Sequence, residues 1–414
     1  MQIIINMMWS TSSSTSTALS STQVQSSHSP FNSAHSHVSL ALMNELSCRE
    51  SLVDASLKIV VTRYGKNWDG RGAQKRLGKR PLEAAASVIE DYELPCTPFD
   101  FNAEVLALLQ ERWVHARVLP GAIRLVQHLH KHNVPIAIAS SSPQRNIQRK
   151  LAHQSGWTEY FPVIVAGDMV KNGKPAPDIF LEAARLLNAE PSKCLVIEDA
   201  PAGVLAGKAA GMQVVAVPSM PSKDARPLYS SADVILSSLL DFQPEVWGLP
   251  PLNDRIGGAL PMEPWYIGGP VIKGFGRGSK ILGIPTANLP TSAFSSQLAD
   301  HVCGIYIGWA GLSNRGIYKM VMSVGWNPYF DNSEKTVEPW ILHDFSEDFH
   351  GEELRLIVVG YIRPEANFTT LEDLVEKIHE DGRIAKAALE MKPFSDYAED
   401  SYLTTPLPLN ISSN

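Results

Sequence analysis

The residues best suited to chemistry lie in a glycine-rich segment of the second half, IKGFGRGSKILGIPTANLP. Its glycines, of which Gly274 is the first, allow backbone amides to approach phosphate oxygens closely. Thr286 and Asn288 stand two residues apart, so their side chains point the same way on an extended chain. A hydroxyl and an amide oxygen are hard ligands, which Mg²⁺ accepts while it keeps waters and phosphate oxygens in its shell. The segment therefore predicts a site for phosphate groups and Mg²⁺.

Two common phosphate-binding motifs do not fit this segment. A Walker A loop ends in Gly-Lys-Ser or Gly-Lys-Thr, whereas Lys280 follows Ser279 and precedes Ile281. A Rossmann fingerprint opens a βαβ unit, and the sequence after Lys280 contains none. A purely structural glycine turn is the alternative, and the nearby Thr286 and Asn288 favour the functional interpretation.

A second group of candidate residues follows apolar runs in the first half. Ser140 comes after IAIA, Lys174 lies in NGKPAPDIF, and the pair Glu198 and Asp199 comes after CLVI. Side chains at the carboxyl ends of parallel strands converge on a ligand. A hydroxyl, an ammonium group and two carboxylates could hold a phosphate and Mg²⁺ there. Each residue alone is typical of a helix cap or a solvated loop, but the ordered set is more specific.

The elements around these residues differ between the two halves. Residues 46–235 form the first predicted domain, in which a helical part at about 50–117 precedes a core at about 118–235 where apolar strands alternate with helices. This alternation predicts a parallel sheet covered by helices on both faces. After a linker at 236–262, residues 263–400 show short strands separated by turns, which predict a small closed barrel.

Two terminal features complete this organisation. A long helix is predicted to begin near Thr369 or Thr370, and its apolar stripe is formed by Leu371, Leu374, Val375 and Ile378. Residues 1–45 are rich in Ser and Thr and are predicted to be disordered, and 401–414 form a tail.

Composition limits the classes of function. The chain has 414 residues, a net charge of −7 and no apolar run of about eighteen residues, which argues against a membrane span and a general nucleic-acid binder. Its four cysteines are far apart, as is common in a reducing compartment. No Lys or Arg precedes Arg49, which fits neither a secretory signal nor a transit peptide well. We expect a cytoplasmic protein, with an organelle signal in the first residues as the open alternative.

The first half resembles the haloacid dehalogenase-like hydrolases, specifically the phosphatases with a helical cap, over about residues 50–218. LPGA, SSS, GKPAPDIF and VIEDAPAGVLAGKAAGM match the later motifs of that family. The resemblance implies that Ser140 and Lys174 bind the phosphoryl group and that Glu198 and Asp199 lie on the side of Mg²⁺.

The first motif of that family, a strand that ends in Asp-x-Asp-Gly-Thr, is missing from the chain. Its first aspartate is the family's nucleophile and its second is the general acid, and a well-formed phosphate site does not replace a nucleophile. The Ser-rich stretch stands where the motif's strand would be. We therefore expect an incomplete sheet and a phosphatase-like half without phosphatase activity.

The second half resembles riboflavin kinases from about residue 263 to 393. The combination of PTAN with VEPWILHDFSEDFHGE and VVGYIRPEANF carries this resemblance. It implies a six-stranded antiparallel barrel with a C-terminal helix, where ATP and riboflavin meet at one end. Glu338 matches the catalytic carboxylate, and Thr286 and Asn288 match the ligands of Mg²⁺, for which Zn²⁺ or Mn²⁺ are alternatives. The implied nucleotide contacts are Gly274, Lys280, Thr286, Asn288, Ile341, His343 and His350, and the implied flavin contacts are Arg363, Ala366 and Phe368.

The order of the two halves resembles the plant family in which an FMN phosphatase is joined to a riboflavin kinase. The leading hypothesis is a kinase that transfers the γ-phosphate of ATP to the riboflavin 5′-hydroxyl, with Glu338 as the base. Two alternatives concern the first half. It could also hydrolyse FMN, or it could be a non-catalytic module that binds phosphorylated ligands or mediates dimerisation. We expect small-molecule substrates, and no nucleic-acid or membrane partner.

Overall fold

A computed structural model describes residues 2–5, 52–112, 119–152, 156–218, 223–273, 284–295, 298, 301–312, 315–326 and 335–404. The chain divides into two compact units, Met1–Leu252 and Asn253–Asn414. The division lies inside the segment 236–262 that the sequence indicates as a linker. No helix among the described residues is long and apolar enough to cross a bilayer.

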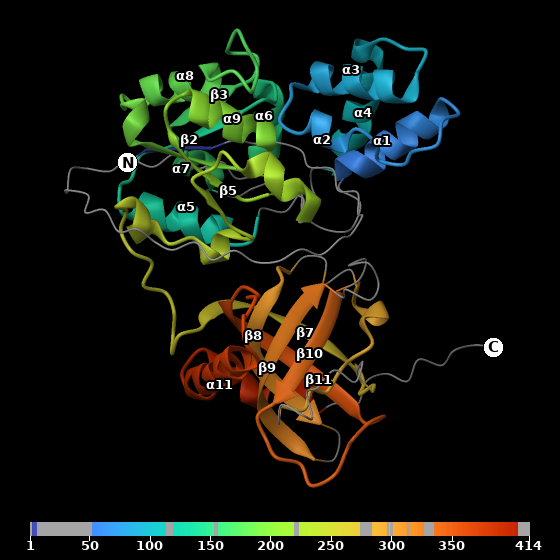
Figure 1. Cartoon of the computed structure of the whole chain (residues 1–414), viewed down its shortest axis with the longest axis vertical. Coiled ribbons are helices and arrows are strands. Elements are labelled where there is room, and N and C mark those ends of the chain that lie inside the picture. The colour runs from blue at the N-terminus through green and yellow to red at the C-terminus, as the bar shows by residue number, and fades with distance from the viewer. Residues whose placement is uncertain are drawn as a thin grey trace. The chain divides into compact units, whose positions relative to one another are not determined.

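The first unit contains a six-stranded parallel sheet in the order β3-β2-β1-β4-β5-β6 (Figure 1). The strands are β1 (Gln2–Ile5), β2 (Ile136–Ser140), β3 (Val163–Ala166), β4 (Cys194–Glu198), β5 (Gln213–Ala216) and β6 (Val234–Ile235). The helices of this core are α5 (Ala122–Lys131), α6 (Gln144–Ala152), α7 (Trp157–Tyr160), α8 (Asp178–Leu186) and α9 (Pro201–Ala209).

Alternating side chains of the strands divide the core into two layers, as the two-residue period of a strand requires. Ile136 and Ile138 of β2 join the apolar cluster on the face that α5 covers, whereas Ala137 and Ala139 join the cluster on the face of α8 and α9. Burial on both faces explains why these strands are continuous apolar runs, and the prediction of a parallel sheet between helices is confirmed.

The strand β1 corrects the expectation of an incomplete sheet and of a disordered segment that begins at residue 1. Ile3 pairs with Ile136 of β2 and with Leu195 of β4, so residues 2–5 fill the centre of the sheet. Three consecutive isoleucines have high strand propensity, and this location gives them strands on both sides. The sheet therefore has no unpaired edge at its centre, and the expectation of an incomplete sheet was wrong.

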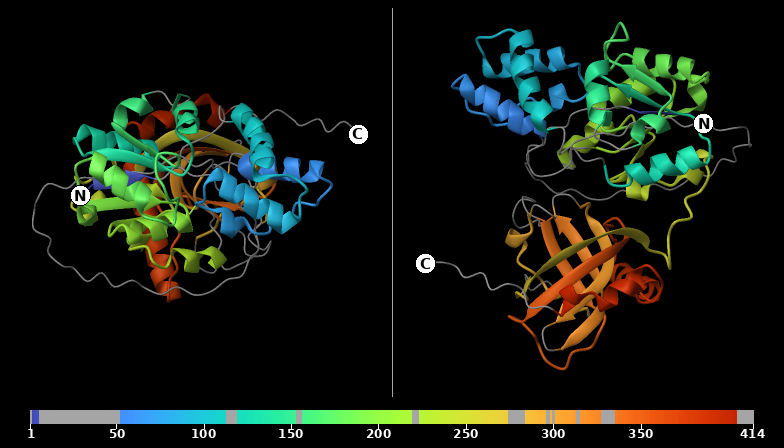
Figure 2. Two further views of the ribbon diagram at one scale, coloured as in Figure 1. Left: turned by 90° about the horizontal axis from the view of Figure 1, so that it is seen from above. Right: turned by 180° about the vertical axis from the view of Figure 1, so that it is seen from behind.

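Four helices in the described residues precede the core of the first unit: α1 (Leu52–Arg63), α2 (Ala73–Arg76), α3 (Pro81–Tyr92) and α4 (Pro98–Arg112). The helix α3 begins at Pro81, because a proline in the first turn loses no intrahelical hydrogen bond. Val60, Val88 and Phe101 belong to the apolar cluster that packs these helices together. Figure 2 shows this helical subdomain beside the sheet-containing core of the same unit.

The second unit is an antiparallel sheet in the order β10-β9-β8-β11-β7, which Figure 2 shows to be strongly curved. Its strands are β7 (Leu260–Pro270), β8 (Gly304–Leu312), β9 (Gly316–Trp326), β10 (Lys335–Ile341) and β11 (Glu353–Arg363). The described residues thus form five strands where six were expected. A shorter extended stretch adds to them, because Ile272 and Asn288 form an isolated bridge.

The long helix α11 (Leu371–Ala388) begins after Thr370, whose hydroxyl oxygen accepts a hydrogen bond from the Asp373 N–H at 3.1 Å. This confirms one of the two predicted starting points. The predicted stripe is wrong at Leu371, which is 55% exposed. The C-terminal half of the helix supplies its buried residues instead, including Asp381 and Ala385.

Candidate active sites

The first candidate site lies at the carboxyl edge of the parallel sheet. Ser140 is the last residue of β2 and Glu198 is the last residue of β4, and β1 runs between these strands. The strand order reverses direction between β1 and β4, and open α/β sheets bind ligands in the crevice at such a point. Ser140 is fully buried, and its hydroxyl oxygen accepts a hydrogen bond from the Ser142 N–H at 3.2 Å.

Lys174 lies at this edge with its charged group completely buried. Its Nζ is 3.2 Å from Glu198 Oε2 and donates to the carbonyl oxygen of Ala139 at 3.4 Å. It also lies 4.6 Å from the ring centre of Phe180. Burial lowers the pKa of Lys174 to about 8, and the negative charge of Glu198 opposes this shift. The structure therefore brings together the predicted residues Ser140, Lys174 and Glu198.

Both carboxylate oxygens of Glu198 have partners within the protein, although the residue was expected on the side of a metal ion. One carboxylate oxygen faces Lys174, and the other accepts a hydrogen bond from the Ala200 N–H at 3.1 Å. A side chain at Gly203 would collide with this carboxylate, so only glycine leaves room for it. Glu198 therefore holds the lysine. Asp199 is buried next to it, and its carbonyl oxygen accepts a hydrogen bond from the Tyr229 hydroxyl at 2.8 Å.

The residue immediately after β1 in the sequence is Asn6, which lies outside the described residues. Because parallel strands end at the same edge, the chain leaves β1 between the ends of β2 and β4. The sequence after β1 reads Asn-Met-Met-Trp and carries no carboxylate. Sequence reasoning missed β1 itself, although the run of three isoleucines was a signal for a strand.

The second candidate site lies in the antiparallel unit, where the segment that contains Thr286 and Asn288 runs beside β10. The Ala287 N–H donates to the carbonyl oxygen of Pro339 at 2.8 Å, and the Ile272 N–H donates to the carbonyl oxygen of Asn288 at 2.9 Å. Glu338 precedes Pro339 in β10 and is half-buried. These backbone bonds bring the predicted metal ligands and the predicted catalytic carboxylate into neighbouring segments.

The side chain of Asn288 supports a role in binding a cation. Its Oδ1 is buried and has no hydrogen-bond partner, and such an orphaned oxygen has a free-energy cost that a ligand can remove. Among the described residues, no group of three or more His, Cys, Asp or Glu side chains could hold a metal ion. A hydroxyl and an amide oxygen fit Mg²⁺, which takes its remaining ligands from water and phosphate.

The predicted nucleotide contacts are only partly described. Gly274 and Lys280 lie outside the described residues. The side chain of Ile341 is buried. His343 and His350 are exposed, and the His343 ring lies 4.6 Å from the ring of Tyr318.

The predicted flavin contacts lie at and after the end of β11. Arg363 forms two hydrogen bonds with Asp381 of α11, at 3.0 Å from Nε and 2.6 Å from Nη2. Burial raises the pKa of Asp381, and the charge of Arg363 opposes the shift. Ala366 is exposed, and the ring of Phe368 lies 5.9 Å from the Arg363 guanidinium carbon. Sequence reasoning missed Asp381, because a lone acidic residue on a helix is usually solvated.

Comparisons with known proteins agree with this division into two units. A family model for riboflavin kinase matches residues 261–389, and one for haloacid dehalogenase-like hydrolases matches residues 41–211. The bifunctional riboflavin kinase/FMN phosphatase of Arabidopsis thaliana is 56% identical over 355 residues, which cover 86% of this chain and 93% of that protein. The riboflavin kinase of Homo sapiens is 48% identical over 139 residues, or 34% of this chain and 90% of that protein. (DL)-glycerol-3-phosphatase 2 of Arabidopsis thaliana is 41% identical over 204 residues, or 48% of this chain and 84% of that protein.

Proposed function

The chain belongs to the family of bifunctional riboflavin kinase/FMN phosphatases, and from this premise we propose that its second unit makes FMN from riboflavin and ATP while its first unit lacks phosphatase activity. The observation that carries the kinase proposal is the Oδ1 of Asn288, which is buried without a hydrogen-bond partner. Asn288 lies in a segment whose backbone is hydrogen-bonded to β10, the strand that contains Glu338.

Glu338 is the base in this proposal. Transfer to the riboflavin 5′-hydroxyl requires a group that accepts the hydroxyl proton near the attacking oxygen. Glu338 lies on a strand, which fixes its backbone, and its neighbours Val337 and Pro339 are buried. Its own side chain is half-buried, so it can face a substrate at the rim of the unit.

Thr286 and Asn288 hold Mg²⁺ in this proposal, with Zn²⁺ or Mn²⁺ as the alternatives. When the cation is bound, it would neutralise part of the negative charge of the phosphate groups. Gly274, Lys280, Ile341, His343 and His350 contact the nucleotide, and Arg363, Ala366 and Phe368 contact the flavin. The hydrogen bonds between Arg363 and Asp381 restrict the orientation of the arginine, which supports a fixed role for this guanidinium.

The proposed inactivity of the first unit rests on the absence of a carboxylate in the sequence directly after β1. Ser140 and Lys174 can bind a phosphoryl group, but the residue that follows β1 in the sequence is Asn6, an amide and not the nucleophilic carboxylate that the resemblance requires. Hydrolysis of FMN, the second activity in the name of the Arabidopsis relative, would need a different nucleophile in this chain.

Two assays on the purified full chain test these proposals separately. We expect FMN formation from riboflavin, ATP and Mg²⁺, and a loss of about 10²–10⁴-fold in kcat in Glu338→Gln while Mg·ATP still binds. A kcat within tenfold of the wild-type value would contradict the assignment of Glu338. We expect no Mg²⁺-dependent release of phosphate from FMN, and release that Asp199→Asn abolishes would contradict the proposed inactivity.

A further inference from the structure

Arg315 and Glu352 form an ion pair at the base of a loop in the second unit. Arg315 directly precedes β9, and Glu352 directly precedes β11. Nε of Arg315 lies 3.0 Å from each carboxylate oxygen of Glu352, and Nη2 lies 2.6 Å from Oε1. The planar guanidinium thus binds both oxygens at once, which fixes the direction of the pair as well as its distance. The side chains are 28% and 30% exposed, so water screens the pair only in part.

The loop between β10 and β11 carries a row of aromatic rings that ends at Arg315. The ring centres of Tyr318 and His343 lie 4.6 Å apart, and the Phe345 ring lies 4.7 Å from that of His343. The Phe349 ring lies 4.8 Å from that of Phe345 and 5.9 Å from the guanidinium carbon of Arg315. The Tyr318 hydroxyl donates to the carbonyl oxygen of Arg315 at 2.6 Å. Arg315 therefore contacts both ends of the row.

The backbone at the end of this loop is connected to the segment of the proposed metal ligands. The Gly351 N–H donates to the carbonyl oxygen of Val271 at 2.8 Å, and the Val271 N–H donates to that of Glu352 at 2.8 Å. The next residue, Ile272, forms the bridge with Asn288. Chains of hydrogen-bonded backbone carry coupling between sites, so the position of Glu352 also affects Asn288.

Residues 342–352 form neither helix nor strand, so contacts with the rest of the unit determine the conformation of the loop. Gly351 has a φ of +84°, in the left-handed region that favours glycine, and it turns the chain just before Glu352. His343 and His350, which are proposed to contact the nucleotide, lie on this loop and are exposed. A loop that is ordered before binding loses less entropy when its ligand binds. The groups that order this loop should therefore raise the affinity for the nucleotide.

We propose that Arg315 is a positioning residue for the nucleotide, because through Glu352 and Phe349 it holds the loop of His343 and His350 in the conformation that binds ATP. This role rests on the proposed kinase function of the second unit. Arg315 acts through its partners, so its loss should weaken nucleotide binding and leave the chemical step unchanged.

The test compares the full-length wild type with Arg315→Gln, which removes the charge and keeps a polar side chain. We expect the KM for Mg·ATP to rise by about fivefold, and the dissociation constant of the Mg²⁺ complex of the β,γ-imido analogue of ATP to rise equally, which is the scale of the entropy that ordering a loop costs. The kcat should stay within about twofold of the wild-type value, since the lost interaction stabilises the bound substrate and the transition state equally. Calorimetry measures the binding of the analogue without any reaction.

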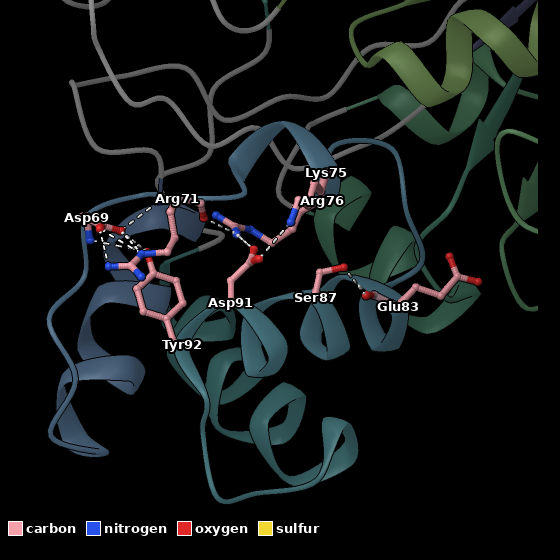
Figure 3. Close-up of polar contacts among 8 residues, drawn as sticks. All are labelled: Asp69, Arg71, Lys75, Arg76, Glu83, Ser87, Asp91 and Tyr92. Carbon is pink, nitrogen blue, oxygen red and sulfur yellow. Dashed lines mark hydrogen bonds and ion pairs between the residues drawn. The ribbon is translucent and has the colours of Figure 1, made fainter.

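Further variants separate the ion pair from a general loss of structure. Arg315→Lys keeps the charge without the planar fork and should give an intermediate effect. Glu352→Gln should weaken binding as Arg315→Gln does, and the double variant should weaken it no further. The matched control is Arg71→Gln, since Arg71 forms the same three side-chain bonds with Asp69 and lies 5.1 Å from the centre of the Tyr92 ring, but in the first unit (Figure 3). It should leave both constants unchanged.

The outcomes separate the positioning role from the proposed function. Unchanged affinity for the analogue in Arg315→Gln, additive effects in the double variant, or equal weakening in Arg71→Gln would overturn the role of Arg315, even if the wild type forms FMN. A wild type that binds the analogue through Arg315 but forms no FMN would contradict the proposed function and support the positioning role. Circular dichroism on every variant identifies one that has lost its fold, and Arg315→Lys then replaces Arg315→Gln in the comparison.

Discussion

Lys174 and Glu198 form an ion pair with 3.2 Å between Nζ and Oε2, and both side chains are fully shielded from solvent. Glu198 ends β4, whereas Lys174 lies in the loop before α8, so the pair joins two separate segments at the sheet edge. Two opposite charges this deep in a protein must satisfy each other, because neither has water. Each partner therefore compensates the buried charge of the other at this edge.

We predict that breaking this pair from one side destabilises the first unit strongly. Lys174→Met removes the cationic partner of the buried Glu198 carboxylate, and breaking a buried ion pair from one side typically costs about 3–5 kcal/mol in the free energy of unfolding. Lys174→Met combined with Glu198→Gln should recover much of that loss. Urea unfolding of the two single variants and the double variant measures the coupling, and additive effects of the two substitutions would contradict it.

The lowered pKa of Lys174 predicts a pH dependence of stability. In the unfolded chain this lysine keeps its proton up to about pH 10.5, whereas in the folded chain it loses the proton near pH 8. Between these values the unfolded state binds more protons, so the contribution of Lys174 to the free energy of unfolding rises with pH.

The measurement compares urea unfolding of the wild type and Lys174→Met across this pH range. The difference, wild type minus variant, should increase by up to about 1.4 kcal/mol per pH unit. The variant is the control for tyrosines and other lysines, which titrate in both proteins. A difference that stays constant with pH would show that the folded lysine titrates normally.

The central location of β1 predicts that acids placed after it create phosphatase activity. Asn6→Asp with Met8→Asp restores the Asp-x-Asp spacing directly after this strand, where the resemblance requires a nucleophile and a general acid. We expect Mg²⁺-dependent release of phosphate from FMN by this double variant, and none by the wild type. Addition of Asp199→Asn should abolish the new activity. Failure of the folded double variant to release phosphate would show that β1 does not replace the missing motif.

The orphaned oxygen of Asn288 predicts a selective effect on the metal. Asn288→Ala removes the oxygen, so the Mg²⁺ concentration for half-maximal FMN formation should rise several-fold, with a smaller change in the KM for riboflavin. Asn288→Asp keeps an oxygen at the same position and should retain metal binding. An unchanged Mg²⁺ titration in Asn288→Ala and in Thr286→Ala would mean that both residues only form a turn.

The sequence predicted the elements whose patterns are local and missed those that depend on distant partners. The apolar runs of β2 and β4 were sufficient to locate these strands. The segment Gln2–Ile5 was not recognised, because four residues before a Ser-rich stretch resemble a strand only once β2 and β4 are known on either side. Leu371 has the spacing of an apolar stripe, but the beginning of α11 is exposed.

The candidate sites show the same limit. The motifs located Ser140, Lys174 and Glu198 at one edge, yet they could not show that both oxygens of Glu198 are engaged by Lys174 and Ala200.

The long sequence separation between β1 and its partner strands also affects how the first unit can fold during synthesis. Ile3 is made before its neighbours in the sheet, because Ile136 follows the helical subdomain in the sequence and Leu195 follows much of the core. A central strand with such distant partners gives the unit a high contact order, and high contact order slows folding. Until β4 has been made, the three isoleucines cannot complete their strand pairing, and apolar strands that wait for their partners are prone to aggregation.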